Sequence, residues 1–401
     1  MSHDSQDLPR QLPDQPNLRH LKDQARDLLK AGGAASLTEA QFKIARLYGF
    51  ASWPRIKAHV ESLKEIGQLK QAIDTNDLER VKELMTRNPE LHRAPLGYGK
   101  SGPLTWAAEC RVPWEPPGPR RLEMARWMIE NGSDVHQGGD GPLARAALNG
   151  MRIAMMELLV SYGADVNADW SGNFPIIFSP CESVDPVVLK WLLEHGAEPN
   201  RGHPKWANTA LDYLIGSYSR SSRLPACIDL LVEAGGTTKY DVPGMLDLLC
   251  NRLDRLAEHL DADPTLVHRR FSELDCGTTM RNLTLRGATL FHVAAEYGKP
   301  EAALLLFDRG AEVNARATVD EAGIGGQTAI FHAATQSDDR GLPMMRLLLE
   351  RGSDLTIRVK LPGYYERPGE VVECTPLGYA LQFSEVGTET VRLLREHGGL
   401  E

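Results

Sequence analysis

Apolar residues follow a helical spacing through most of this chain, in short segments that end at a glycine. In one such segment Ala302, Leu305 and Leu306 fall on one face of a helix, and Gly310 follows. A glycine at this place favours the left-handed conformation that ends a helix. A single unit of this size cannot bury its own apolar face. The pattern therefore predicts units that stack on their neighbours.

The glycine-ended segments recur at a regular period. Their glycines are Gly132, Gly163, Gly196, Gly235, Gly310, Gly352 and Gly398. The successive spacings of 31, 33, 39, 75, 42 and 46 residues indicate a period near 33 with insertions, and the spacing of 75 spans two units. A fixed period of this length predicts a repeat architecture in which each copy is one supersecondary unit.

The copies also open alike, with a capping residue followed by a pair of small residues. The clear openings are GPLTWAAE (102–109), GPLARAALNG (141–150), NTALDYLIG (208–216), TLFHVAAEYG (289–298), TAIFHAAT (328–335) and TPLGYAL (375–381), and NFPIIFS (173–179) is more divergent. A threonine before the helix caps it, and the small pair lets the helix pack closely on its neighbours. Together with the glycine endings, these openings resemble the ankyrin-repeat family over roughly residues 67–401.

The resemblance implies an all-α ankyrin-repeat solenoid of about nine helix–turn–helix units with long finger insertions. Two degenerate copies, at 69–91 and 245–267, resemble each other. We interpret each as the start of a block, which predicts a first ankyrin block over 67–240 and a second over 241–401. Residues 1–66 form a separate leader, because 17–31, 38–50 and 52–63 show helical spacing. This leader resembles those that precede ankyrin arrays in some bacterial proteins, and we expect it to cap the first repeat.

Composition narrows the classes of function. The net charge of -9 and the pI near 5.8 argue against a general binder of nucleic acid or of anionic membranes. The N-terminus has no apolar signal core, and no apolar run approaches the roughly 20 residues of a membrane span. The six cysteines are scattered without a C-x-x-C, as expected for reduced thiols in a cytoplasmic protein. No cofactor and no metal site is predicted.

In the ankyrin family the first helix of each repeat lines a concave surface where partners bind. The resemblance therefore places contacts with a protein partner around the small pair of each copy, at Trp106, Glu109, Arg145, Tyr213, Glu296, Tyr297, His332 and Tyr379. Arg145 and His332 stand where most other copies carry an aromatic residue, which favours a role beyond packing. His292 instead occupies the histidine of the family motif, which bridges neighbouring repeats through its ring nitrogens.

Two long insertions, at 317–329 and 359–377, flank the repeat that contains His332. Loops of such length usually serve function. With Glu296 and His332 they could enclose a pocket that also holds Asp320, Tyr364, Tyr365 and Glu373. This leaves open an alternative function, a small-molecule binding site or an acid–base enzyme site beneath the insertions. The chain has no hydrolase, metalloprotease or P-loop signature, so no catalytic residue is assigned.

The sequence therefore predicts a non-catalytic scaffold for protein–protein interaction, which binds a partner through its concave groove and finger loops. The acidic balance favours a partner with basic or mixed charge. The fold alone does not identify that partner.

Overall fold

The computed structural model describes residues 10–13, 16–96, 101–203, 208–217, 220–274, 277–278, 283–364 and 366–401. The chain divides into two compact units, Met1–Pro142 with Ala154–Gly163 and Leu143–Ile153 with Ala164–Glu401. We call them the first and the second unit and describe each by itself. None of the helices in the described ranges combines the length and apolar character that a membrane span requires.

Helices come in pairs along the chain, and each pair corresponds to one repeat. The described residues contain nine pairs, and the first pair shares its first helix, α3 (Trp53–Asp74), with the leader. The other first helices are α5 (Pro103–Glu109), α7 (Gln137–Leu148), α9 (Phe178–Ser183), α11 (Ala210–Gly216), α13 (Met245–Leu249), α15 (Leu290–Glu296), α17 (Ala329–Ala334) and α19 (Pro376–Ala380). The second helices are α4 (Leu78–Arg87), α6 (Pro119–Glu130), α8 (Ile153–Ser161), α10 (Pro186–Glu194), α12 (Leu224–Glu233), α14 (Leu253–Ala262), α16 (Pro300–Asp308), α18 (Leu342–Glu350) and α20 (Thr388–Glu396). Short 3-10 turns, η1 (Pro89–Arg93) and η3 (Pro264–Val267), follow α4 and α14.

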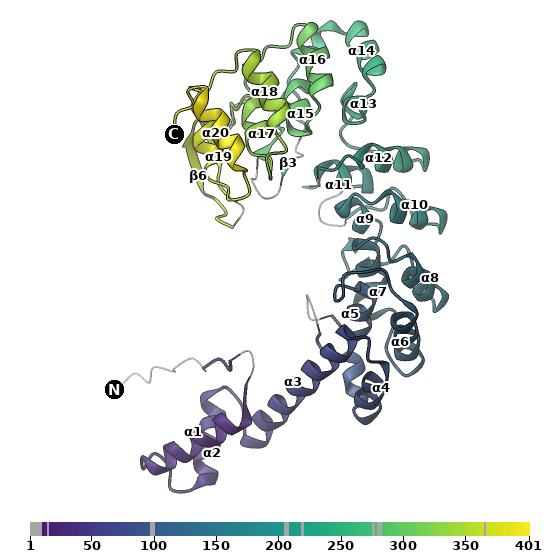
Figure 1. The fold of residues 1–401 in the computed structure, drawn as a ribbon, viewed down its shortest axis with the longest axis vertical. Coiled ribbons are helices and arrows are strands. Elements are labelled where there is room, and N and C mark those ends of the chain that lie inside the picture. The colour runs from purple at the N-terminus through teal and green to yellow at the C-terminus, as the bar shows by residue number, and fades with distance from the viewer. Residues whose placement is uncertain are drawn as a thin grey trace. The chain divides into compact units, whose positions relative to one another are not determined.

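The helices of the second unit form two layers. First helices pack on one another in the series α9–α11 and α13–α15–α17–α19, and second helices do so in the series α10–α12 and α14–α16–α18 (Figure 1). The small residues Ala294 and Ala333 of the openings are fully buried, so the first helices approach closely. Leu306 and Leu348 on the second helices are buried as well. The predicted all-α ankyrin solenoid is confirmed.

The glycine endings have the predicted backbone conformation. All seven glycines have a positive φ, between 81° and 122°. The residue at this point must turn the chain out of the helix in the left-handed region, which a side chain disfavours. The recurring glycine is therefore required by the backbone of each repeat.

The leader forms a small core of its own in the first unit. It contains α1 (Leu18–Lys30), α2 (Leu37–Leu47) and the start of α3, which bury Leu21, Ile44 and Ile56 between them. The third leader helix is longer than predicted, because it runs past Leu63 to Asp74 without a break. No proline or helix-capping signal stops it, and the lone Gly67 is tolerated inside the helix. The predicted boundary at residue 66 falls within α3.

In the described part of the second unit, antiparallel β-hairpins precede α9, α15 and α19. These are β1 (Asp169–Trp170) with β2 (Phe174–Pro175), β3 (Gly277–Thr278) with β4 (Leu283–Thr284), and β5 (Val359–Pro362) with β6 (Val371–Cys374). The insertion at 317–329 also folds back on itself, since Val319 and Gly325 pair as a bridge. The all-α fold therefore carries short strands where the sequence predicted only long fingers.

Backbone hydrogen bonds join neighbouring fingers of the second unit. The Gly325 N–H donates to the Lys360 carbonyl on β5 at 2.9 Å. The Thr318 N–H donates to the Gly287 carbonyl, also at 2.9 Å. We call residues 287–288, 318–325, β5 and β6 together the finger layer. The Gly325–Lys360 hydrogen bond thus connects the two long insertions.

The cysteines in the described ranges are free thiols, and Cys110, Cys181, Cys227 and Cys374 are buried. Burial raises the pKa of Cys227 and of Cys374 to about 12. The thiolate is the reactive form of cysteine, so these thiols are held in an unreactive state.

Candidate functional site

Trp106 and Glu109, the two predicted contact residues of the first unit, are buried in α5. Trp106 is 7% exposed, and its indole N–H donates to the Asp74 carboxylate at 2.7 Å. The Lys70 ammonium lies 4.4 Å from the Trp106 ring centroid. Glu109 is 2% exposed, and its carboxylate lies 3.5 Å from the guanidinium of Arg111. Both side chains are thus buried and contact other groups of the same chain.

Two further predicted residues, Arg145 and Tyr213, lie at the ends of a row of aromatic contacts in the second unit. The Arg145 guanidinium stands 5.5 Å from the Trp170 ring centroid. Trp170 meets Phe174 edge-on at 5.9 Å between centroids, and Phe174 meets Tyr213 edge-on at 5.6 Å. Tyr213 stacks on Phe178 at 4.6 Å. We call Trp170, Phe174, Phe178 and Tyr213 the aromatic cluster.

The aromatic cluster has a buried base and a partly exposed surface. Phe178 is fully buried, whereas Trp170, Phe174 and Tyr213 are partly exposed. The Tyr213 hydroxyl donates to the Glu182 carboxylate at 3.2 Å, which fixes the direction of the ring. The cluster therefore presents rigid aromatic area beside the Glu182 carboxylate, and the buried Arg145 packs at its other end.

Sequence reasoning missed Trp170 and Phe174, although a signal for them exists. They face each other across the β1–β2 hairpin in the stretch DWSGNFP (169–175). Ser171 and Gly172 in its turn both have positive φ. A three-residue Ser-Gly-Asn turn between two aromatic residues is a hairpin signal, and the two residues that flank the turn pair across the strands.

Glu296 and His332 form the centre of a buried polar network. Both are fully buried, and the Glu296 Oε2 lies 2.8 Å from the His332 Nδ1. The Arg220 guanidinium donates to the Glu296 Oε1 at 2.9 Å, and its side chain is 9% exposed. Both carboxylate oxygens of Glu296 are thus bonded to basic groups of the same chain.

The same network ties distant repeats together. Tyr297 is 8% exposed, and its hydroxyl donates to the Ile215 carbonyl at 2.6 Å. The Arg220 guanidinium also lies 4.2 Å from the Tyr297 ring centroid. Arg220 and Ile215 come from the repeat of α11 and α12, whereas Tyr297 follows α15. The network therefore links two repeats that are separated in sequence by the degenerate copy of α13 and α14.

His292 bridges neighbouring repeats, as its place in the family motif implies. Its Nδ1 accepts from Thr289 at the start of α15, and its Nε2 lies 3.2 Å from the Gln327 carbonyl of the next repeat. This pattern assigns a neutral ring that donates from Nε2. Burial, together with the nearby His332 ring, lowers the pKa of His292 to about 3. His292 is thus a neutral structural histidine.

The residues predicted around the fingers occupy different environments. Tyr379 is fully buried, and its hydroxyl donates to the Pro362 carbonyl at 3.0 Å. The Tyr364 hydroxyl donates to the Glu385 carboxylate at 3.2 Å. Asp320 and Glu373 are exposed, whereas Glu296 and His332 are buried, and Tyr365 lies outside the described residues.

Asp320 has a local role in its own finger. Its carboxylate accepts from the N–H groups of Ala322 and Ile324 at 2.9 and 2.8 Å. Of the residues predicted for the pocket, Glu296 and His332 are in direct contact. Within the described ranges, no group of three or more His, Cys, Asp or Glu side chains is placed to hold a metal ion.

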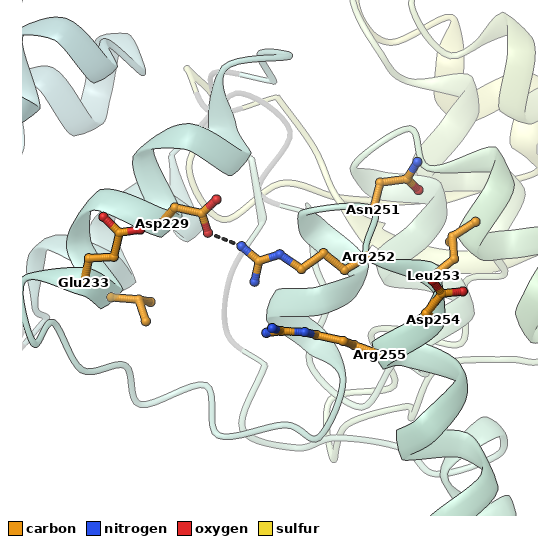
Figure 2. Close-up of a pocket in the computed structure, with 8 residues that line it drawn as sticks. Asp229, Glu233, Asn251, Arg252, Leu253, Asp254 and Arg255 are labelled. Atoms are coloured by element: carbon orange, nitrogen blue, oxygen red, sulfur yellow. Dashed lines mark hydrogen bonds and ion pairs between the residues drawn. The ribbon is translucent and has the colours of Figure 1, made fainter.

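A hollow of about 850 Å³ lies beside α12 and the start of α14. Figure 2 shows Arg252 and Arg255 directed from α14 toward Asp229 and Glu233 on α12, with the Arg252 guanidinium bonded to the Asp229 carboxylate. The Asp229 hydrogen bond raises the pKa of Arg252. The Arg252 guanidinium also lies 3.6 Å from the Asp247 carboxylate. These ion pairs attach the degenerate repeat to its neighbour, and we assign this hollow a structural role.

Comparisons with known proteins identify the repeat itself. Residues 286–315 match the family model described as an ankyrin repeat, and they contain α15, α16 and the Gly310 ending. Among solved structures the chain is similar to the crystal structure of the human ASB11 ankyrin repeat domain. That match has 21% sequence identity, covers 65% of this chain and 99% of that chain, and has a TM-score of 0.32. The comparison with curated proteins found no match.

Proposed function

The chain is an ankyrin-repeat protein, and from this premise we propose that it is a scaffold that docks a protein partner on the aromatic cluster and its β1–β2 hairpin. Ankyrin repeats are generally modules for protein–protein interaction. The observation that carries the proposal is the row of partly exposed rings from Trp170 to Tyr213, flanked by Arg145 and Glu182.

The chemistry of this surface suits a binding centre. Tryptophan, tyrosine and arginine dominate the binding energy of protein interfaces. The rings of the aromatic cluster pack on one another, so their order costs little additional conformational entropy when a partner binds. Glu182 supplies a carboxylate at its margin, which suits a partner with basic or mixed charge, whereas the buried Arg145 supports the Trp170 ring from within the fold.

The other predicted contact residues support this surface indirectly. Trp106, Glu109, Arg145, Glu296, Tyr297, His332 and Tyr379 are all buried. In our proposal these side chains fix the repeats, and Tyr213 remains as a contact with the partner. The alternative acid–base site has less support, because Arg220 and His332 engage both carboxylate oxygens of Glu296.

The test is capture of partners from a lysate of the source cells, with the wild type beside two variants. Trp170→Ala/Tyr213→Ala removes two of the three partly exposed rings of the aromatic cluster. Phe42→Ala is the matched control, since it removes a ring that is 50% exposed on the leader. We expect a protein that the wild type and the control retain and that the double variant loses. Thermal melting of each variant verifies that the repeats remain folded.

Equal retention by all three proteins would contradict docking on the aromatic cluster. A thermal-shift screen with small metabolites then tests the alternative of a small-molecule site. A ligand that stabilises the wild type but not a Tyr364→Phe/Glu373→Gln variant would favour a site beneath the insertions.

A further inference from the structure

We propose that the open edge of β6 binds an extended segment of a partner protein as an added strand, with a basic residue opposite Glu373. This site lies on the finger layer and shares no residue with the aromatic cluster, so the inference goes beyond the proposed function. It rests on the direction of the backbone groups of β6, on their exposure and on the charge beside them.

The register of the hairpin fixes which backbone groups of β6 face outward. In an antiparallel pair, alternate residues turn their N–H and C=O groups to opposite sides. The Gly363 N–H donates to the Glu370 carbonyl at 2.9 Å, so Glu370 and Val372 turn these groups toward β5. Val371 and Glu373, which alternate with them, turn theirs away. These two residues offer two N–H and two C=O groups to an added strand.

The hydrogen bonds of β5 agree with this alternation of inward-facing and outward-facing residues. Lys360 pairs with Glu373, so its backbone groups must also face away from the hairpin. Its carbonyl does accept from the Gly325 N–H, at 2.9 Å, on the side remote from β6. The β5 edge is therefore already occupied by the neighbouring finger, and the corresponding edge of β6 is the one that can accept a strand.

The edge of β6 is accessible, and no other described strand covers it. Within the described part of the chain, β5 is the one strand that pairs with β6. Val371 is 46% exposed, and Glu373 is exposed as well. Natural edge strands are often blocked by proline or lysine, and β6 has neither. The C-terminal residues lie at the base of the hairpin, where Arg358 donates to the Glu401 carbonyl at 3.2 Å, and they leave Val371 open.

The charge of Glu373 favours a particular sequence in a strand added at the edge of β6. Val371 and Glu373 lie on the same face of β6, so an added strand places one residue opposite each, two positions apart. An apolar β-branched residue suits Val371. Lysine or arginine suits Glu373, whose carboxylate would then lie between Lys360 of β5 and the basic residue of the added strand. Glu366 and Glu370 add negative charge at the tip, where Arg367 pairs with Glu370 at 2.9 Å.

A second copy of this chain is the rival occupant. Pairing of β6 with β6 of a second copy would bring two acidic tips together, on chains that each carry a net charge of -9. That repulsion disfavours a second copy relative to a basic segment. We therefore assign the edge to a foreign strand that alternates apolar and basic residues.

The first test uses the full chain and a short synthetic peptide with blocked ends that alternates valine and lysine. Amide hydrogen exchange is followed with and without saturating peptide. We expect slower exchange at Val371 and Glu373 and no change in the β1–β2 hairpin. The same peptide with N-methyl groups on its edge-facing amides should bind about tenfold more weakly or worse, because each methyl removes a backbone hydrogen bond.

The second test reverses the charge. Glu373→Lys should weaken binding of the lysine peptide about tenfold and should let a valine–glutamate peptide bind instead. Glu258→Lys, an equal charge change at an exposed position on α14, is the matched control and should bind the lysine peptide normally. The Trp170→Ala/Tyr213→Ala variant should also bind it normally.

Three results would overturn the inference. The first is unchanged exchange at Val371 and Glu373 with peptide bound, or N-methylation without effect. The second is a dimer in sedimentation that protects these amides without peptide, which would assign the edge to a second copy. The third is loss of peptide binding in the Trp170→Ala/Tyr213→Ala variant. Failure of the lysate capture bears only on the aromatic cluster, so the two proposals fail separately.

Discussion

The carboxylate of Glu296 lies between the guanidinium of Arg220 and the imidazole of His332, in a part of the second unit closed to water. A buried ion pair contributes little net stability, because both charges lose their hydration. Removal of one partner is costly, since the other charge then stays buried and uncompensated. The network therefore adds little net stability to the fold. Substitution of Glu296 is nevertheless expected to be costly, because it leaves a buried charge unpaired.

Glu296→Gln should lower the free energy of unfolding by about 3–5 kcal/mol, because it leaves the buried Arg220 cation without its carboxylate. Urea unfolding followed by circular dichroism measures the loss. Glu389→Gln is the control, since that carboxylate pairs with Arg392 at 2.6 Å on the surface, where water screens the pair. Similar losses in the two variants would show that Glu296 does not hold a buried cation.

The lowered pKa of His292 predicts how the stability of the second unit depends on pH. The unfolded histidine takes up a proton below about pH 6.5, whereas the folded one, with its pKa lowered to about 3, stays neutral. Its contribution to stability is complete above pH 6.5 and is lost as the pH falls from there toward 3. The limiting slope is about 1.4 kcal/mol per pH unit.

The measurement compares wild type and His292→Gln by urea unfolding at about pH 7, 6 and 5, which lie in and above this window. The variant loses the bond to Gln327 and should be less stable at about pH 7, but its stability should fall less steeply with acid. Other titrating groups act equally on both proteins, so the difference between them isolates His292. If the free energies of unfolding of the two proteins fell equally steeply with pH, the assignment of His292 as a neutral, buried ring would be refuted.

At the scale of elements, local chemistry was enough to predict the helix pairs and their ends. The Gly310 ending, for example, follows from the need for a left-handed residue after α16, which a sequence shows directly. The length of α3 was not predictable in this way, because the degenerate copy after Leu63 lacks a capping signal to separate it from the leader.

The candidate site was predicted less completely, because its environment depends on residues far apart in the chain. Arg145 and Tyr213 were identified from equivalent positions on the first helices, but Trp170 reaches Arg145 from the β1–β2 hairpin, which lies outside those helices. Glu296 was expected on an open concave surface. It is buried because Arg220 reaches it from a repeat 76 residues earlier in the sequence.

Gly67→Ala should raise the stability of the first unit by about 0.5–1 kcal/mol, because alanine loses less conformational entropy than glycine on entering a helix. Gly67 lies inside α3, and an added Cβ would meet no atom within 4 Å. Thermal unfolding measures the gain. A loss of stability instead would mean that the middle of α3 is not helical in solution.

Gly310→Val should destabilise the second unit by more than about 1 kcal/mol, because a β-branched residue is strained in the left-handed region. Gly310 has a φ of 96° there. Each repeat contacts mainly its neighbours, so limited proteolysis should cut the repeats around α16 before those of the first unit. Equal cutting of both units would contradict this localisation.

At the scale of the whole molecule, the net charge of -9 acts on every encounter with a partner. It attracts basic segments and repels acidic ones over distances that salt controls, about 10 Å at 0.1 M. Such a field changes association rates more than dissociation rates. The charge is therefore expected to select partners before any residue of the finger layer or the aromatic cluster touches them.

Binding of the valine–lysine peptide should accordingly depend on salt. Raising the salt concentration from about 0.05 M to about 0.5 M should slow association roughly tenfold and leave dissociation nearly unchanged. Stopped-flow fluorescence with a labelled peptide gives both rates. The Glu258→Lys control should show a slightly shallower dependence. An association rate independent of salt would remove the electrostatic part of the proposal.

The buried cysteines can report on local unfolding of the repeats that contain them. Cys110 follows α5, Cys181 lies in α9, Cys227 in α12 and Cys374 in β6, so they sample repeats along the array. A thiol reagent can attack each one only while the repeat around it is open, because the folded thiol is buried. At Cys181, Cys227 and Cys374 burial also raises the pKa, which keeps the thiol protonated. The labelling rate at each cysteine, read by mass spectrometry without any mutation, then ranks the repeats by how often they open.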